Sequence, residues 1–573
     1  MLASMIASLP MARARVQTAA LRPSIAAFGL ALVAGLGLSL ASCGTGNPGI
    51  DPPDASLGFP AGLLLDPRVS TEAGEACVSD EECGGGLCTS GGVCRDTAQW
   101  LFVTNANSDR RYNAGSILAI DLDGFFEALA DEDSILGASE SVSENEPCRR
   151  IPNLPQAIEC LEEPFVATEV TTRFGNFPGP VSAWLPEGAG DDEATLLIPV
   201  RGDPSVTYIE LSGGLDGGAP TLDCGQANNE SDSRRCGDEH RLRFLRNDSE
   251  SARLAREPFR VLVSPGPGRP LAYVSHQGDP DLTLISLDGL STLTDVLGDG
   301  SFVHEYVGRP AIVDQSNDLV LTGAPINLQG GFGLAQRPCD PEAEFVPNST
   351  LGCTRPLIYT GMRWTAQVRT FTAIENEPLP GQVCENPGVD PAEIGATGQI
   401  ICEPQVQGLS GFDAGGLSTA GVPVSTGRPI LADIGFSRTG DELYVVQSNP
   451  GGLLRIDTSV NDSGEVLDVA TGQVEVCSQP TSLVIYDDGQ VEYGLVTCYR
   501  SGEVYIVDLA QLTVVGISRA GIGPNAMTVD LGREVVYVGN SLDATVSVID
   551  MNPQNAARFT QIARIGIQEP YVQ

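Results

Sequence analysis

The chain contains no lysine, and all 33 of its basic residues are arginine. Schiff-base catalysis and a phosphate-binding loop of the Walker type both require a lysine amine, so the sequence excludes both. Histidine is almost as scarce, with only His240, His276 and His304 in 573 residues. No Gly-x-Ser-x-Gly motif occurs, and no histidine lies near a plausible serine or cysteine nucleophile. The sequence therefore shows no catalytic group of side chains.

Positively charged residues are also few compared with acidic ones: 33 arginines face 74 acidic residues, which gives the chain a formal net charge of -41. Such a charge repels phosphate backbones, which argues against nucleic acid as a partner. Several arginines do gather between residues 234 and 260. In so acidic a chain, we interpret them as partners of internal ion pairs rather than as an anion site. We interpret Arg201-Gly202-Asp203, which continues a predicted strand into its turn, as a chance match to an integrin-type motif.

The N-terminal residues have the pattern of an export signal. Three arginines precede an uncharged apolar run at 25–40, which is too short to span a membrane comfortably and suits a signal peptide. The residues Leu-Ala-Ser-Cys at 40–43 resemble the lipobox of bacterial lipoproteins. This resemblance implies that residues 1–42 are removed, that Cys43 carries acyl chains such as palmitate, and that the protein is anchored in the cell envelope, on the outer membrane. The alternative is a plain signal peptide followed by a chance cysteine.

The other cysteines fall into local even groups, which in an exported chain indicates disulfides. The groups are Cys77, Cys83, Cys88 and Cys94; Cys148 and Cys160; Cys224 and Cys236; Cys339 and Cys353; Cys384 and Cys402; and Cys477 and Cys498. The connectivity within the first group stays open. Zinc is the competing interpretation, but no two cysteines have the spacing Cys-x2-Cys and few histidines exist. We therefore expect neither a zinc site nor a cofactor.

Residues 523–567 contain four short runs rich in β-branched residues and separated by turn residues, which is typical of a small antiparallel sheet. Within these runs, the residues YVGN and TVSVID resemble the YVTN repeat of bacterial β-propellers of the YncE type. One such sheet cannot bury both of its faces alone, so it needs copies of itself arranged in a ring. The resemblance therefore implies a propeller.

The repeat pattern, anchored on the proline that opens each copy, predicts blades that start near residues 60, 180, 258, 310, 429, 480 and 524. The predicted fold class is therefore all-β: a seven-bladed β-propeller of four-stranded antiparallel blades over 59–567. Residues 43–58 are expected to form a flexible linker, and 568–573 a C-terminal tail.

Insertions interrupt three of the predicted blades. Blade 1 carries a cysteine-rich insertion at 70–97, and further cysteine-bearing insertions lie at 123–165 (with a helix predicted at 125–136), 212–239, 323–356 and 373–399. All of them fall in turns between the first and second or the third and fourth strands, which lie on one face of a propeller. Loops closed by disulfides lose less freedom on binding, so we expect a protein or other envelope ligand to bind that face. A bond between Cys477 and Cys498 would instead join blades 5 and 6.

One loop offers a candidate calcium site. Asn105, Asn107 and Asp109 present oxygen atoms at alternate positions after a predicted strand, as a calcium loop does. The glycine and the terminal glutamate of an EF-hand are missing. The simpler interpretation is a loop without metal.

Two functions fit these observations. The first is a membrane-anchored lipoprotein whose rigid propeller is a binding or scaffold module. The alternative is a propeller enzyme of the lactonase or quinoprotein-dehydrogenase type, which the fold resemblance alone suggests. An enzyme would need charged side chains that converge at the mouth of the central channel, on the face opposite the insertions. We therefore expect binding rather than catalysis.

Overall fold

The structure is a computed structural model of the chain, in which residues 51–573 form one compact unit. It describes residues 49–568 except 70–73, 84–85, 131–141, 144–145, 187–191, 226–232, 265–268, 280, 296–301, 307, 317–329, 340–355, 364, 375–398, 401–402, 415–429 and 462–465. The predicted signal peptide and Cys43 lie outside these residues. No helix within the described part is long and apolar enough to cross a membrane.

Seven antiparallel sheets form a seven-bladed β-propeller, and we number the blades in chain order. Blade 1 consists of β1 (Pro60–Leu65), β4 (Trp100–Asn105), β5 (Gly115–Asp121) and β8 (Thr172–Phe174). Blade 2 consists of β9 (Ser182–Trp184), β10 (Glu193–Val200), β11 (Ser205–Ser212) and an outer strand in two pieces, β12 (Thr221–Asp223) and β13 (Arg241–Leu242). Blade 3 consists of β14 (Pro258–Ser264), β15 (Leu271–His276), β16 (Leu282–Ser286) and β19 (Ala311–Ser316).

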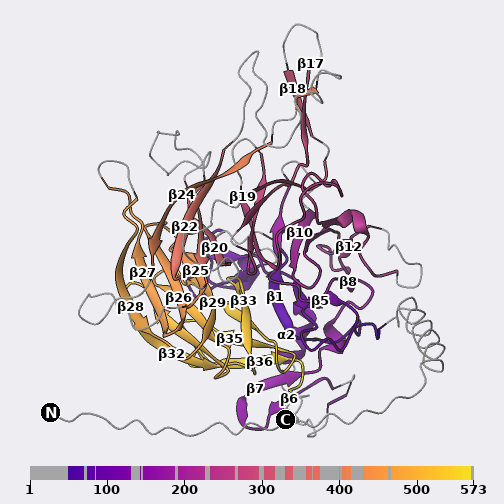
Figure 1. Ribbon diagram of the computed structural model, residues 1–573. Coiled ribbons are helices and arrows are strands. Elements are labelled where there is room, and N and C mark those ends of the chain that lie inside the picture. The colour runs from indigo at the N-terminus through magenta and orange to yellow at the C-terminus, as the bar shows by residue number, and fades with distance from the viewer. Residues whose placement is uncertain are drawn as a thin grey trace, which may run out of the picture. The chain divides into compact units, whose positions relative to one another are not determined.

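The other four blades repeat this order. Blade 4 consists of β20 (Gly331–Gln336), β21 (Ile358–Met362), β22 (Gln367–Ile374) and β24 (Gln405–Asp413). Blade 5 consists of β25 (Ile430–Phe436), β26 (Glu442–Asn449), β27 (Gly451–Asp457) and β28 (Val469–Glu475), and blade 6 of β29 (Pro480–Asp487), β30 (Glu492–Cys498), β31 (Glu503–Asp508) and β32 (Thr513–Arg519). Blade 7 consists of β33 (Pro524–Asp530), β34 (Val535–Asn540), β35 (Thr545–Asp550) and β36 (Gln561–Ile565). Figure 1 shows first strands such as β1 and β33 near the centre and fourth strands such as β28 and β32 at the rim.

The core lies between the blades. Side chains alternate along each strand, so one strand contributes to two interfaces. In β34, Val536 and Val538 pack against blade 6, whereas Val535 and Tyr537 pack against blade 1. The buried hydrophobic clusters of the described residues each join two neighbouring blades, and together they close the ring.

The predicted start of blade 4 is wrong. The strand after Pro310 is β19, which pairs with β16 as the fourth strand of blade 3, and blade 4 begins at β20. The proline at 310 matches the pattern that opens other blades, but β20 has no proline at its start. β20 starts at Gly331, and its third residue, Gly333, leaves no room for a side chain, because a Cβ atom on it would lie 2.7 Å from the backbone nitrogen of Ile434 in the next blade.

Two cysteine-bearing insertions cover the outer edges of neighbouring blades. The insertion of blade 1 contains α2 (Leu122–Ala130), which starts before the helix predicted at 125–136, and the hairpin β6 (Cys148–Ile151) and β7 (Leu154–Cys160). β7 pairs in parallel with β36, so this hairpin extends blade 7 (Figure 1). In the blade 2 insertion, the backbone nitrogen of Cys236 donates to the carbonyl of Arg173 in β8, the outer strand of blade 1, at 2.9 Å.

Smaller elements complete the described part. β17 (Ser291–Asp295), β18 (Phe302–Tyr306) and β23 (Gln399–Ile400) form a small sheet, at the top of Figure 1, from insertions of blades 3 and 4. The cysteine-rich insertion contains β2 (Leu87–Cys88) and β3 (Cys94–Arg95). Three short 3-10 helices are η1 (Asp80–Glu82), η2 (Glu163–Phe165) and η3 (Asp238–His240).

Residues 51–58, predicted as part of a flexible linker, are instead held against the propeller. Asp54 forms ion pairs of 2.8 Å with both Arg173 and Arg234. The backbone nitrogen of Gly58 donates to Oδ1 of Asn105 at 2.9 Å. The linker is therefore shorter than the sequence indicates.

Disulfides join the predicted partners wherever both cysteines are described. The bonds are Cys77–Cys88, Cys83–Cys94, Cys148–Cys160, Cys224–Cys236 and Cys477–Cys498. The first two resolve the connectivity that the sequence leaves open, and the last joins blade 5 to blade 6. Cys339 is also disulfide-bonded. Cys353, Cys384 and Cys402 lie outside the described residues.

Candidate functional site at the mouth of the central channel

A cavity of about 1330 Å³ opens at the mouth of the central channel. Its lining comes from the starts of the first strands, such as Ala61 and Asn525, and from turns between second and third strands, such as Pro450. Because strands alternate in direction, these positions lie on one face, and the cysteine-bearing insertions leave from the other. The cavity is larger than the pockets of roughly 300–1,000 Å³ that hold most small ligands.

A stack of four side chains forms one wall of the cavity. The rings of Phe259 and Phe332 stack with their centroids 3.8 Å apart. The guanidinium of Arg201 lies 5.6 Å from the centroid of Phe259, and that of Arg363 lies 4.2 Å from the centroid of Phe332. Such contacts are attractive and orient the planar guanidinium group. Blades 2, 3 and 4 therefore hold two cations at fixed positions beside the cavity.

The backbone fixes both arginines in the same way. Arg201 directly follows β10 and Arg363 directly follows β21, so each is the first residue after a second strand. The backbone nitrogen of Arg201 donates to the carbonyl of Phe177 at 3.1 Å, and that of Arg363 to the carbonyl of Gly330 at 2.9 Å. Equivalent bonds start from Ala106, Gln277 and Ser541 in blades 1, 3 and 7. Other side chains are therefore compatible with this position.

The charge of Arg201 is only partly compensated within the protein. Nη1 of Arg201 lies 3.3 Å from Oε1 of Gln277, but no carboxylate of the described residues comes within ion-pair distance of the guanidinium. Burial lowers the pKa of Arg201, and the charge of Glu257 raises it by less. Burial, followed by the charge of Arg201, lowers the pKa of Arg363. The two arginines thus repel each other in a partly dehydrated site.

Arg260, which also lines the cavity, is neutralised. Its Nη2 lies 2.7 Å from Oδ2 of Asp433, which is fully buried. The same carboxylate accepts the backbone N–H of Leu483 at 2.9 Å. This pair ties the first strand of blade 3 to those of blades 5 and 6, and we interpret it as structural.

The wall formed by blades 5, 6 and 7 differs in character. It carries hydroxyl and carboxamide side chains, among them Asn449, Thr471, Gln473, Gln479, Thr481 and Asn525. Glu475 is the only acidic side chain in the described lining. The buried lining atoms that have no hydrogen-bond partner among the described residues include Nε of Arg201 and Oδ1 of Asn525. A ligand that accepts from one and donates to the other would satisfy both.

The oxygens of the calcium candidate are engaged by the chain itself. Oδ1 of Asn105 accepts from Gly58, and Oδ1 of Asn107 accepts the backbone N–H of Tyr112 at 3.0 Å. Asp109 forms an exposed ion pair with Arg111 at 3.1 Å. Calcium binding by this loop remains a prediction.

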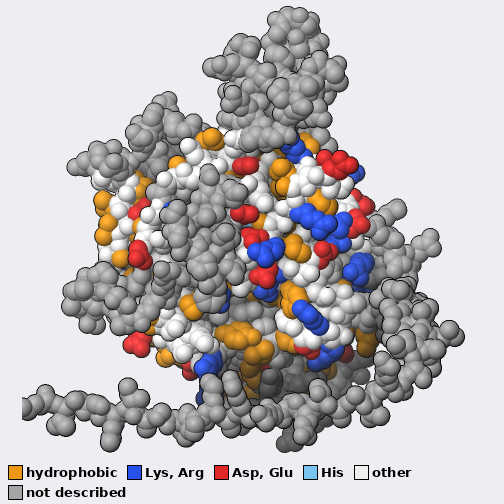
Figure 2. Space-filling model, in the orientation of Figure 1, with side chains coloured by type: hydrophobic (Ala, Val, Ile, Leu, Met, Phe, Trp, Pro, Cys, Tyr) orange, Lys and Arg blue, Asp and Glu red, His pale blue; other side chains and the backbone are white. Residues whose placement is uncertain are grey.

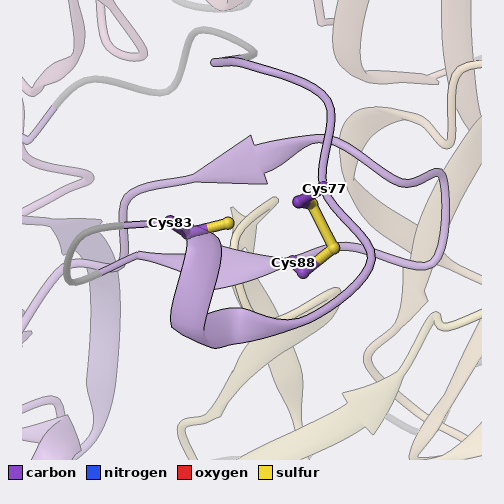
Figure 3. Close-up of side chains that lie close together, drawn as sticks. All are labelled: Cys77, Cys83 and Cys88. Carbon is purple, nitrogen blue, oxygen red and sulfur yellow. A yellow bond between two sulfur atoms is a disulfide. The ribbon is translucent and has the colours of Figure 1, made fainter.

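One group of possible metal ligands stands out among the described residues. The sulfur atoms of Cys77, Cys83 and Cys88 lie within 4.8 Å of one another. All three are in disulfides, and Figure 3 shows the bond from Cys77 to Cys88 with Cys83 beside it. A sulfur in a disulfide is not a thiolate ligand, so this arrangement is a disulfide core of the cysteine-rich insertion.

The arginines between 234 and 260 largely form internal ion pairs, as the sequence indicates. Arg256 pairs with Asp279 at 2.6 Å, and Arg241 pairs with both Asp203 and Asp238. Figure 2 shows arginine and acidic side chains intermixed over the described part of the visible face, so neither sign forms a separate patch there.

The described histidines are not part of the cavity lining, although His276 directly precedes the lining residue Gln277. The His240 ring stacks on Tyr208 with 4.3 Å between centroids. His276 is fully buried, and its Nε2 lies 2.9 Å from the Thr283 hydroxyl. The side chain of His304 is outside the described residues.

Sequence reasoning missed Arg201 and Arg363. The signal available was their shared position, directly after the second strand of a repeat, where five blades can be aligned through one backbone hydrogen bond. The tripeptide at 201–203 drew attention to Arg201 for another reason. Its aspartate in fact pairs with Arg241.

No protein-family model matches the chain, and neither does any curated protein. Among solved structures, a protein from Lactobacillus plantarum is 12% identical, with a TM-score of 0.36, over 74% of this chain and 83% of its own. Hydrazine synthase from Kuenenia stuttgartiensis is 11% identical, with a TM-score of 0.39, over 86% and 96%. The β-propeller domain of Cps50 (Swd1) from Myceliophteria thermophila is 9% identical, with a TM-score of 0.36, over 82% and 95%. At such low TM-scores these likenesses carry no argument; the strand order of the sheets itself shows the propeller.

Proposed function

We propose that the protein is a lipid-anchored envelope lipoprotein whose rigid propeller binds an anionic ligand at the mouth of its central channel. Disulfides such as Cys148–Cys160 suit an oxidising compartment outside the cytoplasm. The lipobox-like residues at 40–43 supply the anchor, in the outer membrane. The role is that of a binding or scaffold module.

The observation that carries the proposal is the pair Arg201 and Arg363 beside a large cavity. Keeping two guanidinium groups partly dehydrated and near each other is unfavourable, because each loses hydration and the charges repel. The fold does not require arginine there, since equivalent positions hold Ala106 and Ser541. An anion in the cavity would compensate the charge of Arg201, offset its repulsion with Arg363 and accept charge-assisted hydrogen bonds. The stack of Phe259 and Phe332 also holds the two guanidinium groups in place before a ligand binds. This order reduces the entropy lost on binding.

The expected partner surface on the insertion-bearing face remains a prediction. Two of its insertions are occupied in covering blade edges, which gives them a structural role. The lactonase or quinoprotein-dehydrogenase alternative also remains a prediction. The described lining contains arginines, amides and Glu475, and offers no paired acid and base that would favour it.

Citrate, as a generic carboxylate, tests for the anion site. The chain from residue 43 with Cys43→Ser is titrated with citrate by calorimetry at low salt, alongside the double variant Arg201→Gln/Arg363→Gln. Arg438→Gln is the matched control, because Arg438 lies between β25 and β26 on the opposite face and its side chain is 78% exposed. We expect citrate to bind the parent and the control and not the double variant. Equal binding by all three would refute the anion site.

Labelling with a radioactive fatty acid tests the anchor. The wild-type chain should incorporate the label and fractionate with outer membranes. The Cys43→Ser variant should lose the label and become soluble. Membrane association of the wild type without label would contradict the lipid anchor and leave the citrate result untouched.

A further inference from the structure

The two walls of the cavity have different chemistry, and the difference restricts the ligand. Blades 2 to 4 present Arg201 and Arg363, whereas blades 5 to 7 present mainly hydroxyl and carboxamide groups, such as those of Gln479, Thr481 and Asn525. A compact inorganic anion would contact only the first wall. The size of the cavity, about 1330 Å³, also exceeds what such an anion needs.

The polar wall is suited to a ligand with many hydroxyl groups. Carboxamides and hydroxyls both donate and accept hydrogen bonds, as each hydroxyl of a sugar does. Oδ1 of Asn525 is a buried acceptor without a partner among the described residues, so a hydroxyl donor placed there would satisfy it. The planar guanidinium groups opposite match a carboxylate or sulfate, which accepts two parallel N–H bonds.

We infer that the cavity binds an acidic saccharide, with its carboxylate or sulfate against Arg201 and Arg363 and its hydroxyl groups against the amide-rich wall of blades 5 to 7. This inference rests on the proposed function and names the class of its ligand. The ligand would contact both walls, and it would bond to Nε of Arg201 and to Oδ1 of Asn525.

An acidic peptide is the main competitor and fits less well. Arginine clusters also recognise acidic peptide motifs, but the rest of a bound peptide is usually held by strand addition or by pockets for its side chains. In the polar wall, apolar residues such as Pro450 and Val476 are interspersed with polar ones. The phenylalanine rings are already covered, Phe259 by Arg201 and Phe332 by Arg363. Tyr499 is the remaining aromatic residue of the described lining, so the lining offers one such ring rather than a pair to anchor a peptide side chain.

Four tetramers separate these ligands: tetragalacturonate, a sulfated heparin tetrasaccharide, neutral maltotetraose and tetraglutamate. Affinities are measured by calorimetry for the soluble Cys43→Ser chain. We expect at least one acidic tetrasaccharide to bind tighter than both maltotetraose and tetraglutamate by about tenfold or more. Binding of tetragalacturonate shows that a carboxylate suffices, whereas binding of the heparin tetrasaccharide alone, which carries carboxylates as well as sulfates, indicates that sulfate is required. Arg201→Gln should weaken binding of the acidic tetrasaccharide by roughly 10- to 100-fold, as expected for the loss of a charged hydrogen bond. Arg438→Gln should change the affinity for the acidic tetrasaccharide by no more than about twofold.

The polar wall is tested separately with Asn525→Leu, and with Asn525→Ala in case leucine perturbs folding. Either change should weaken the acidic saccharide by roughly tenfold, as for the loss of one buried hydrogen bond. Citrate binding should be unchanged. Tetraglutamate binding as tightly as the saccharides, or Asn525 variants that bind them normally, would overturn the saccharide inference while citrate binding survives. Loss of the citrate response itself would instead remove the proposed function.

Discussion

The contact between the first and last blades offers the sharpest test of how this ring is held closed. Glu159 in β7 lies between Arg149 in β6 and Arg564 in β36. The Glu159 side chain is 4% exposed and that of Arg564 is 6% exposed. The distances are 2.7 Å to Arg149 and 3.5 Å to Arg564. One buried carboxylate thus bridges a hairpin of blade 1 to the outer strand of blade 7.

We expect Glu159→Gln to destabilise the protein by about 3 kcal/mol. The change keeps the shape of the side chain but leaves two guanidinium groups without their carboxylate, and breaking a buried pair costs about 3–5 kcal/mol. The amide oxygen still accepts one hydrogen bond, which places the value at the lower end. Because Glu159 in β7 pairs with Arg564 in β36, the change weakens the contact that joins the blade 1 hairpin to blade 7.

Equilibrium unfolding in urea, followed by circular dichroism, measures the effect on the soluble Cys43→Ser chain. Arg438→Gln again serves as the control, because its 3.3 Å pair with Asp487 involves a side chain that is 78% exposed. Exposed pairs contribute about 0–1 kcal/mol. If Glu159→Gln unfolds within about 0.5 kcal/mol of that control, the buried bridge does not hold the ring closed.

Two further results are expected. Cys477→Ala/Cys498→Ala should lower the unfolding free energy by about 3 kcal/mol, because the bond closes a 21-residue separation. Non-reducing peptide mapping should find the two cysteines linked in the parent. An unchanged midpoint of urea unfolding would contradict this prediction. Burial lowers the pKa of His276 to about 4. Between about pH 4 and 6.5, the unfolded state therefore binds more protons at this residue than the folded state does. The unfolding free energy should fall as the pH falls through that window, by up to about 3 kcal/mol. Burial raises the pKa of Asp281 to about 6, and this shift changes the unfolding free energy with pH in the opposite direction. The measurement is therefore the difference between wild type and His276→Gln in the slope of unfolding free energy against pH. Equal slopes would refute the prediction for His276.

The sequence predicted the blades well where local signals repeat. β1, β14, β29 and β33 begin at the prolines used as anchors, because a proline can open a strand without breaking its ladder. The prediction failed at blade 4, because its first strand, β20, starts with glycine, whereas β19, the outer strand of blade 3, follows a proline. Close approach between neighbouring blades, as at Gly333, is a tertiary constraint that no local pattern carries.

The candidate site could be predicted only in part. The sequence showed an acidic chain and favoured ion pairs for its arginines, which holds for Arg256 and Arg241. It could not show that Arg201 and Arg363, 162 positions apart in the printed numbering, meet across a phenylalanine stack. That contact depends on the placement of blade 4, which is where the repeat alignment was wrong.

The fixed segment at 51–58 links the proposed anchor to the proposed site. It crosses blade 1 from Asp54, paired with Arg173 in the outer strand, to Gly58, bonded to Asn105 at the end of β4. That end of β4 lies on the same face as the cavity, because second strands end there. If Cys43 is lipidated, residues 43–50 span at most about 29 Å even when extended. The tether would then start near Asp51, which pairs with Arg173 in the outer strand of blade 1. We therefore predict that the cavity face tends to face the membrane.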